Sequence, residues 1–140
     1  MGIRFLKMAV VYIVAGICIG IYMGISLNFA LTSVHTHANL LGWATLAICG
    51  LIYLRFPKAA ESPLAKWHFW LHAIGLPLML IMLTMMANDY TYEWVTILKR
   101  VGETLAGTGV FIFGINVFKN INEEEFVVPV RNGDSKEVRH

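Results

Sequence analysis

Four of the five histidines of this 140-residue chain, His35, His37, His68 and His72, lie inside long apolar stretches. An ionisable side chain in such a stretch is costly to bury, so it is a functional candidate by default. A neutral imidazole is also the most common metal ligand in proteins. The alternative for each is a structural, hydrogen-bonded histidine near the membrane surface, and it applies most to His68.

The spacing of the histidines limits what each pair can bind. His35 and His37 are two residues apart, which is a rotation of about 200° on a helix. They therefore point to opposite faces and serve two separate sites rather than one ion. His68 and His72 are four residues apart and share a face. They could bind one small ion together, or His72 alone could meet a cofactor.

The elements that position these histidines are predicted to be membrane-spanning helices. Apolar residues make up 57% of the chain and charged residues only 14%, whereas about a quarter of a soluble domain is charged. No Asp, Glu, Lys or Arg occurs between Lys7 and Arg55 or between Lys66 and Asp89, and about 20 apolar residues span a bilayer. We predict an all-α integral membrane four-helix bundle over residues 1–118, followed by a polar cytoplasmic tail over 119–140. The expected spans are 5–24, 32–54, 63–86 and a fourth that begins within 92–101 and ends near 118.

Local residues mark several helix ends and the orientation. Thr32 or Ser33 is expected to cap the second span and Ser62 the third. The Lys and Arg bias places both termini and the loop 55–66 in the cytoplasm, which predicts a multi-pass protein of a bacterial-type inner membrane. The expected partner is the lipid bilayer. Nucleic acid is excluded because the net charge is only +2 and the basic residues are split among short flanks.

Glycines and cysteines carry weaker signals. Gly16, Gly20 and Gly24 form a double GxxxG pattern that lets another helix approach closely. That helix belongs either to the same chain or to a second copy in a homo-oligomer. Cys18 and Cys49 form no CxxC pair, and CxxCH is absent, which argues against covalent c-type haem.

The run from His35 to Trp43 (HTHANLLGW), followed by Gly50, Tyr53 and Pro57, resembles the tenth helix of the catalytic subunit of haem–copper oxidases. The cbb-type branch and its nitric oxide reductase relatives are the most similar. The resemblance implies that His35 binds a high-spin haem and His37 a low-spin haem, on opposite faces of one helix.

Two further segments extend this resemblance over roughly residues 30–118. The run from Lys66 to Gly75 (KWHFWLHAIG) resembles the next helix of those subunits. Lys99-Arg100 takes the place of a basic pair that holds haem propionates. The chain departs from the family because its first and fourth predicted helices contain no histidine, so the copper-site ligands needed for oxygen reduction are absent. The resemblance thus implies a fragment-sized member or a small cytochrome.

The second axial ligand of each iron is left open. With antiparallel helices, His37 and His72 differ in depth by on the order of 10–17 Å at 1.5 Å per residue, too far for one iron. Met82, Met85 or Met86 lies at a suitable depth for His/Met ligation, unless these methionines only pack. Otherwise a second subunit supplies the ligand and haem b, one or two per chain, is shared between subunits. Lys99 and Arg100 could instead simply extend to the membrane surface.

Three functions remain in competition. The first is a b-type haem membrane protein for electron transfer or for oxygen or nitric oxide binding, with quinol or cytochrome c as electron donor. The second is a bundle that binds or transports copper or another transition metal through His68, His72 and methionines. The third is an assembly subunit without a cofactor, which leaves the two histidines of the HxH pattern unexplained.

Overall fold

The computed structural model describes residues 1–122, and these residues form helices with no strand. The first span is α1 (Gly2–Ser26). The second is continuous through α2 (Thr32–His37), a π-helix η1 (Ala38–Thr45) and α3 (Leu46–Arg55). The third is α5 (Pro63–Ala87) and the fourth is α6 (Glu93–Asn120), with the short α4 (Pro57–Glu61) between the second and third. The predicted polar tail lies outside the described residues from position 123 onward.

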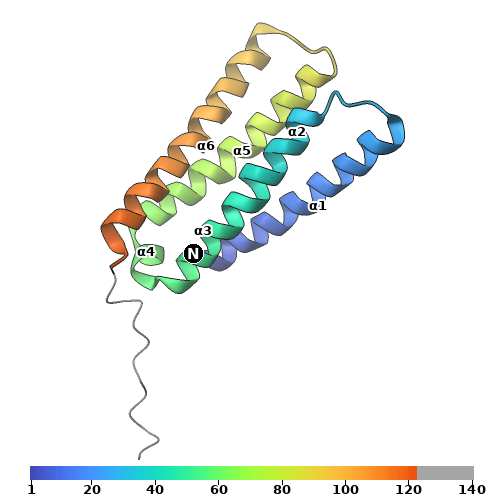
Figure 1. Ribbon diagram of the computed structural model, residues 1–140. Coiled ribbons are helices and arrows are strands. Elements are labelled where there is room, and N and C mark those ends of the chain that lie inside the picture. The colour runs from blue at the N-terminus through green and yellow to red at the C-terminus, as the bar shows by residue number, and fades with distance from the viewer. Residues whose placement is uncertain (123–140) are drawn as a thin grey trace, which may run out of the picture.

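The four spans run alongside one another as two antiparallel hairpins (Figure 1). α1 packs against η1 and α3, and α5 packs along α6; the hairpins meet where α5 contacts α2 and η1. The N-terminus, α4 and the end of α6 share one end of the bundle, called the N-terminal end below. The connections at 27–31 and 88–92 share the opposite end. All four spans are long and apolar enough to cross a membrane, so the predicted four-helix membrane fold is confirmed.

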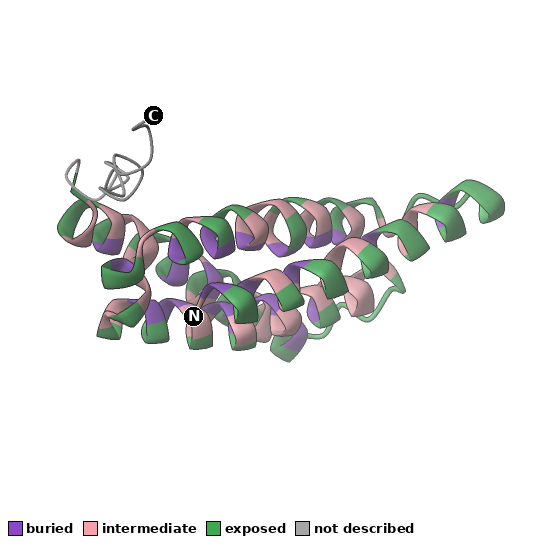
Figure 2. Cartoon of the chain, turned by 90° about the horizontal axis from the view of Figure 1, so that it is seen from below, coloured by how far each residue is buried: buried purple, intermediate pink, exposed green. Residues whose placement is uncertain are grey.

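The outer surface of the bundle is apolar, as contact with lipid requires. Exposed residues cover the outward faces of the helices and buried residues line the inner ones (Figure 2). Large apolar side chains such as Val11 (66% exposed), Ile25 (81%) and Phe111 (78%) point outward. In water such a surface would be an aggregation liability. The chain is therefore a multi-pass membrane protein.

Two helix starts differ in how well the sequence predicts them. Ser62 caps α5 as expected, because its Oγ accepts a hydrogen bond from the Leu64 amide at 3.0 Å, with Pro63 at the first helical position. The prediction of a Thr32 or Ser33 cap is wrong. Leu31 occupies the cap position without a side-chain bond, and the Thr32 hydroxyl donates to the Phe29 carbonyl of the preceding turn at 2.7 Å.

Glycines set how closely the helices approach. A Cβ on Gly75 would lie 2.6 Å from the Ala106 amide nitrogen, and one on Gly102 would lie 2.6 Å from the Met79 nitrogen. The backbones of α5 and α6 are thus in direct contact. In the other hairpin, Gly16 accommodates the Asn39 side chain of η1.

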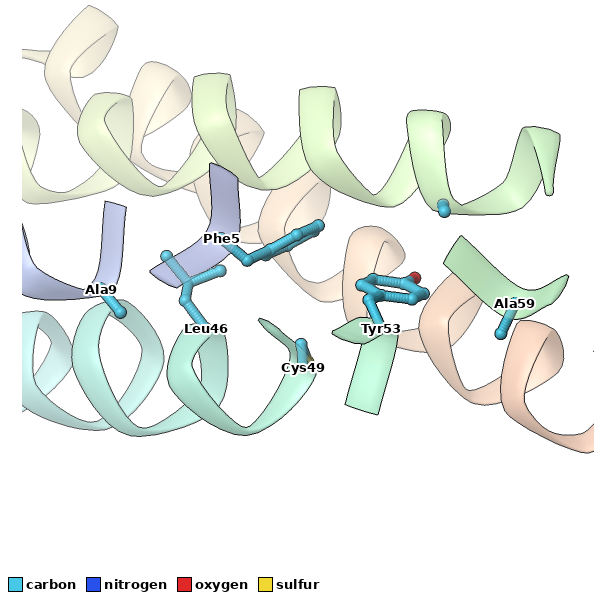
Figure 3. Close-up of a cluster of buried hydrophobic side chains, with 7 residues drawn as sticks. Phe5, Ala9, Leu46, Cys49, Tyr53 and Ala59 are labelled. Atoms are coloured by element: carbon cyan, nitrogen blue, oxygen red, sulfur yellow. The ribbon is translucent and has the colours of Figure 1, made fainter. Parts of the chain in front are cut away.

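Aromatic and aliphatic side chains fill the N-terminal end of the bundle. Phe5 of α1 and Leu46, Cys49 and Tyr53 of α3 are buried together there (Figure 3). The Phe5 ring lies 5.3 Å from the Tyr53 ring and 4.6 Å from the His68 ring of α5, centroid to centroid. This cluster joins the two hairpins and encloses His68.

The α5–α6 contact predicts opposite outcomes for two alanine substitutions on α6. Gly102→Ala should lower the free energy of unfolding by about 1–3 kcal/mol, because its methyl group would overlap the α5 backbone. Gly107→Ala, with nothing within 4 Å of the added atom, should be neutral or slightly stabilising. The measurement is unfolding in mixed detergent micelles followed by circular dichroism. Equal stability of both variants would contradict the close packing.

Candidate functional site

His35 lies against the glycine pattern of α1. Its Nδ1 donates to the Gly16 carbonyl at 2.9 Å, and a Cβ on Gly20 would lie 3.0 Å from the ring. The Asn39 amide donates to the His35 carbonyl at 2.8 Å and fills the space over Gly16. Gly16 and Gly20 therefore serve a contact within the chain, whereas a Cβ on Gly24 would meet nothing within 4 Å. The half-buried imidazole is held in place from two sides.

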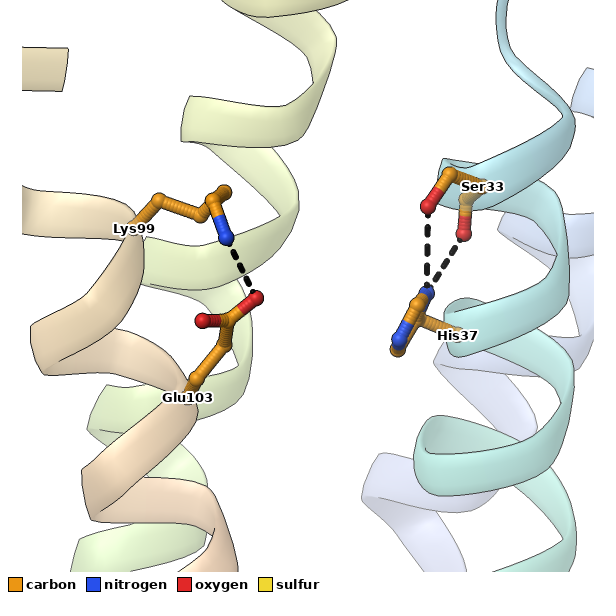
Figure 4. A network of polar contacts seen from close by, with 4 residues as sticks. All are labelled: Ser33, His37, Lys99 and Glu103. Atoms are coloured by element: carbon orange, nitrogen blue, oxygen red, sulfur yellow. Dashed lines mark hydrogen bonds and ion pairs between the residues drawn. The ribbon is translucent and has the colours of Figure 1, made fainter. Parts of the chain in front are cut away.

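His37 is oriented by its own helix instead. Its Nδ1 donates to the Ser33 carbonyl at 2.7 Å and lies 3.5 Å from the Ser33 hydroxyl (Figure 4). None of its hydrogen bonds involves α1, which is the partner of His35. The two histidines thus have different surroundings, in line with the rotation predicted from their spacing.

The basic pair at the start of α6 splits into two environments. Lys99 Nζ lies 2.7 Å from Glu103 Oε1, with the lysine side chain 19% and the glutamate side chain 42% exposed. In Figure 4, the Lys99–Glu103 pair and the His37 ring both point from their helices toward the middle of the view. Arg100 lines a shallow depression on α6 with Ile97, Val101, Thr104 and Leu105. Lys99 and Arg100 therefore have different neighbours.

The predicted methionine ligands are placed separately. Met82 is buried, with 6% of its surface exposed. Met85 lines an apolar groove between the hairpins, together with Val34 and Ala38 of the second span. Neither methionine shares a hydrogen-bond or ring-contact partner with His35 or His37 in residues 1–122. His/Met ligation within one chain stays a prediction.

The helix changes its winding directly after His37. Residues Ala38–Thr45 form a π-helix, and the Thr45 hydroxyl donates to the Leu40 carbonyl five residues earlier at 2.8 Å. Such wide turns occur frequently at functional sites. η1 contacts both α1 and α5, so it lies between the HxH histidines and the histidines of α5.

A second polar group lies at the N-terminal end of the bundle, around Tyr53. The Tyr53 hydroxyl and His68 Nδ1 are 3.1 Å apart, and Asn116 Nδ2 donates to Tyr53 Oη at 3.3 Å and to the Ala59 carbonyl at 2.9 Å. Asn120 Nδ2 in turn donates to Asn116 Oδ1 at 2.6 Å. Helices α3, α4, α5 and α6 therefore meet at one hydrogen-bonded network.

His68 and His72 have nitrogens without hydrogen-bond partners. Both residues are 0% exposed, and their rings lie 5.6 Å apart, centroid to centroid. His68 Nε2 and both ring nitrogens of His72 have no partner. The Leu41 carbonyl of η1 lies close to the His72 ring but does not meet hydrogen-bond geometry with either nitrogen. Each such atom in a native protein calls for an explanation, such as an ion or a water.

The sequence identifies the histidines but not the residues that support them. Asn116 is 0% exposed and holds the network together, yet it is not among the predicted site residues. The sequence feature that could have identified Asn116 is an asparagine within an apolar span, because asparagine side chains form hydrogen bonds between membrane helices. In residues 1–122, no three His, Cys, Asp or Glu side chains form a group that could hold a metal ion.

The Tyr53–Asn116 bond predicts non-additive effects on stability. Tyr53→Phe and Asn116→Ala should each lower the free energy of unfolding by roughly 1–3 kcal/mol, because each leaves buried polar groups unpaired. The double variant should lose less than the sum, by about 0.5–2 kcal/mol. Asn28→Ala, at an exposed turn, is the control and should change stability by less than about 0.5 kcal/mol. Strict additivity in the micelle unfolding assay would argue against the network.

No protein-family model, curated protein or solved structure matches the chain. The two candidate groups are the HxH pair His35 and His37, and the Tyr53 network with His68 and His72.

Proposed function

We propose that this chain is a membrane cytochrome that binds haem b through His35 and His37. The observation that carries the proposal is the hydrogen bond from each Nδ1 to a main-chain carbonyl, at 2.9 Å for His35 and 2.7 Å for His37. A neutral imidazole with its proton on Nδ1 keeps the lone pair on Nε2. A ring held in this way by a carbonyl is the usual form of a metal-ligating histidine.

The surroundings of the two rings favour separate haem positions. His35 packs over Gly16 and Gly20 of α1, so its ring is fixed at the interface of the first hairpin. His37 makes its hydrogen bonds to Ser33 within its own helix and has no α1 partner among them. One iron per ring agrees with this arrangement. A larger side chain at Gly20 would displace the His35 ring, so this glycine belongs to the proposed site.

The chain's own residues would hold, orient and bury the group. Haem supplies a reversible one-electron change or a coordination position for a gas, and its potential depends on the axial ligands and on burial. Lys99 projects toward the same side as His37, which supports a contact with a propionate. That contact would compete with Glu103. The remaining ligand of each iron comes from Met82, from Met85 or from a second copy of the chain.

The setting of the proposed cytochrome is a bacterial-type inner membrane with both termini in the cytoplasm. This orientation rests on the Lys and Arg bias of the loops. It places the HxH pair in the outward half of the membrane, with quinol or cytochrome c as the electron donor.

The proposal predicts distinct spectra for single histidine variants. Purified protein from haem-replete cells should show a Soret band and a sharp reduced α-band. His35→Ala and His37→Ala should each lose a different part of the absorption and EPR signals, because each ring serves its own iron. Thr36→Ala, an exposed residue between the two histidines, is the matched control and should retain both signals. A colourless protein that stays colourless after haem addition, or identical spectra for the two histidine variants, would contradict the proposal.

A further inference from the structure

The three unpartnered nitrogens of His68 and His72 need a ligand that the haem proposal does not supply. These histidines lie on α5 four residues apart, beside the Tyr53 network and not beside the HxH pair. Phe5 and Phe113 pack against the His68 ring at 4.6 and 5.2 Å, centroid to centroid. Leaving three such atoms unsatisfied inside an apolar bundle is unfavourable. A ligand that both imidazoles can share removes most of this cost.

The separation of the two rings suits one shared ion. A metal–nitrogen bond is about 2 Å long and a ring nitrogen lies about 1 Å from its centroid, so rings on one ion have centroids within roughly 6–7 Å. The observed distance is 5.6 Å. Histidines at positions i and i+4 of one helix are also an established metal-binding spacing.

His68 has an oxygen beside it that fits the outer shell of a metal site. His68 Nδ1 lies 3.1 Å from Tyr53 Oη, so a proton on Nδ1 leaves Nε2 for the ion. With an ion on Nε2, His68 Nδ1 would donate a hydrogen bond to Tyr53 Oη, which also accepts one from the Asn116 amide.

The charge of the surroundings restricts the kind of ion. A ligating imidazole is neutral, the rings of Phe5 and Phe113 pack against His68, and no group of three His, Cys, Asp or Glu side chains that could hold a metal occurs in residues 1–122. A divalent ion would bring two uncompensated charges into the membrane interior, which is costly. A monovalent ion that accepts low coordination numbers and imidazole ligands fits better, and Cu(I) has these properties.

From this arrangement we infer that His68 and His72 form a buried site for a single Cu(I) ion, with Tyr53 as a positioning residue. The site is separate from the HxH pair and does not depend on haem binding. A bound ion would satisfy His68 Nε2 and one nitrogen of His72.

The test is a competition between the purified full-length protein and bicinchoninate for Cu(I), in detergent with ascorbate present. The wild type should withhold one equivalent of copper, and X-ray absorption should show imidazole nitrogens around a low-coordinate Cu(I). His72→Leu should withhold none. Tyr53→Phe should bind about 10–100-fold more weakly while keeping the imidazole signature, because His68 loses its orienting bond.

Two controls separate the outcomes. The double variant His35→Ala/His37→Ala should retain the copper, which distinguishes this site from the proposed haem ligands. His72→Leu should stay folded by circular dichroism, because it replaces an imidazole without hydrogen-bond partners by an apolar side chain. Copper withheld by His72→Leu, loss of copper in the His35/His37 double variant, Zn(II) bound as tightly as Cu(I), or no copper bound by the wild type would each overturn the inference.

Discussion

The structure depends on the need to pair polar atoms in an apolar interior. Lipid offers no hydrogen bonds, so a spanning segment must satisfy its backbone internally, and the chain does this with helices. The same constraint applies to each polar side chain placed between the helices. Asn39, Tyr53 and Asn116 meet it by bonding to neighbouring helices or to their own. The α5 histidines meet it only at His68 Nδ1, and their other three ring nitrogens have no hydrogen-bond partner.

The polar side chains inside the bundle form two groups, at two different depths along the helices. Near the connection at 27–31, Nδ1 of His35 and Nδ1 of His37 are each bonded to a carbonyl. Near the N-terminal end, the Tyr53 network holds His68 in one orientation. The π-helix η1 lies between the two groups and contacts both α1 and α5.

Much of the fold is predictable because hydropathy and charge act over whole segments. The four spans follow from the uncharged stretches, and Ser62-Pro63 specifies the start of α5. The cap predicted at Thr32 fails because its hydroxyl bonds to the preceding turn, a local competition that sequence does not resolve. The π-helix and the short α4 are not among the elements predicted from the sequence.

The candidate site is predictable only at the level of residue types. Helical spacing separates His35 from His37 and pairs His68 with His72, and the structure agrees with both. The supporting atoms come from distant parts of the chain: Gly16 for His35, and Asn116 for the Tyr53 network. No local pattern connects residues that are 19 or 63 positions apart.

The most direct measurement of the central claim is the protonation of the imidazoles in ¹⁵N-histidine-labelled protein free of metal and haem, observed by NMR in detergent micelles. The account predicts that His35 and His37 carry their protons on Nδ1, assigned by comparison with single-histidine variants, so that each Nε2 keeps the lone pair that binds iron. A proton on Nε2 of either ring at neutral pH would contradict it.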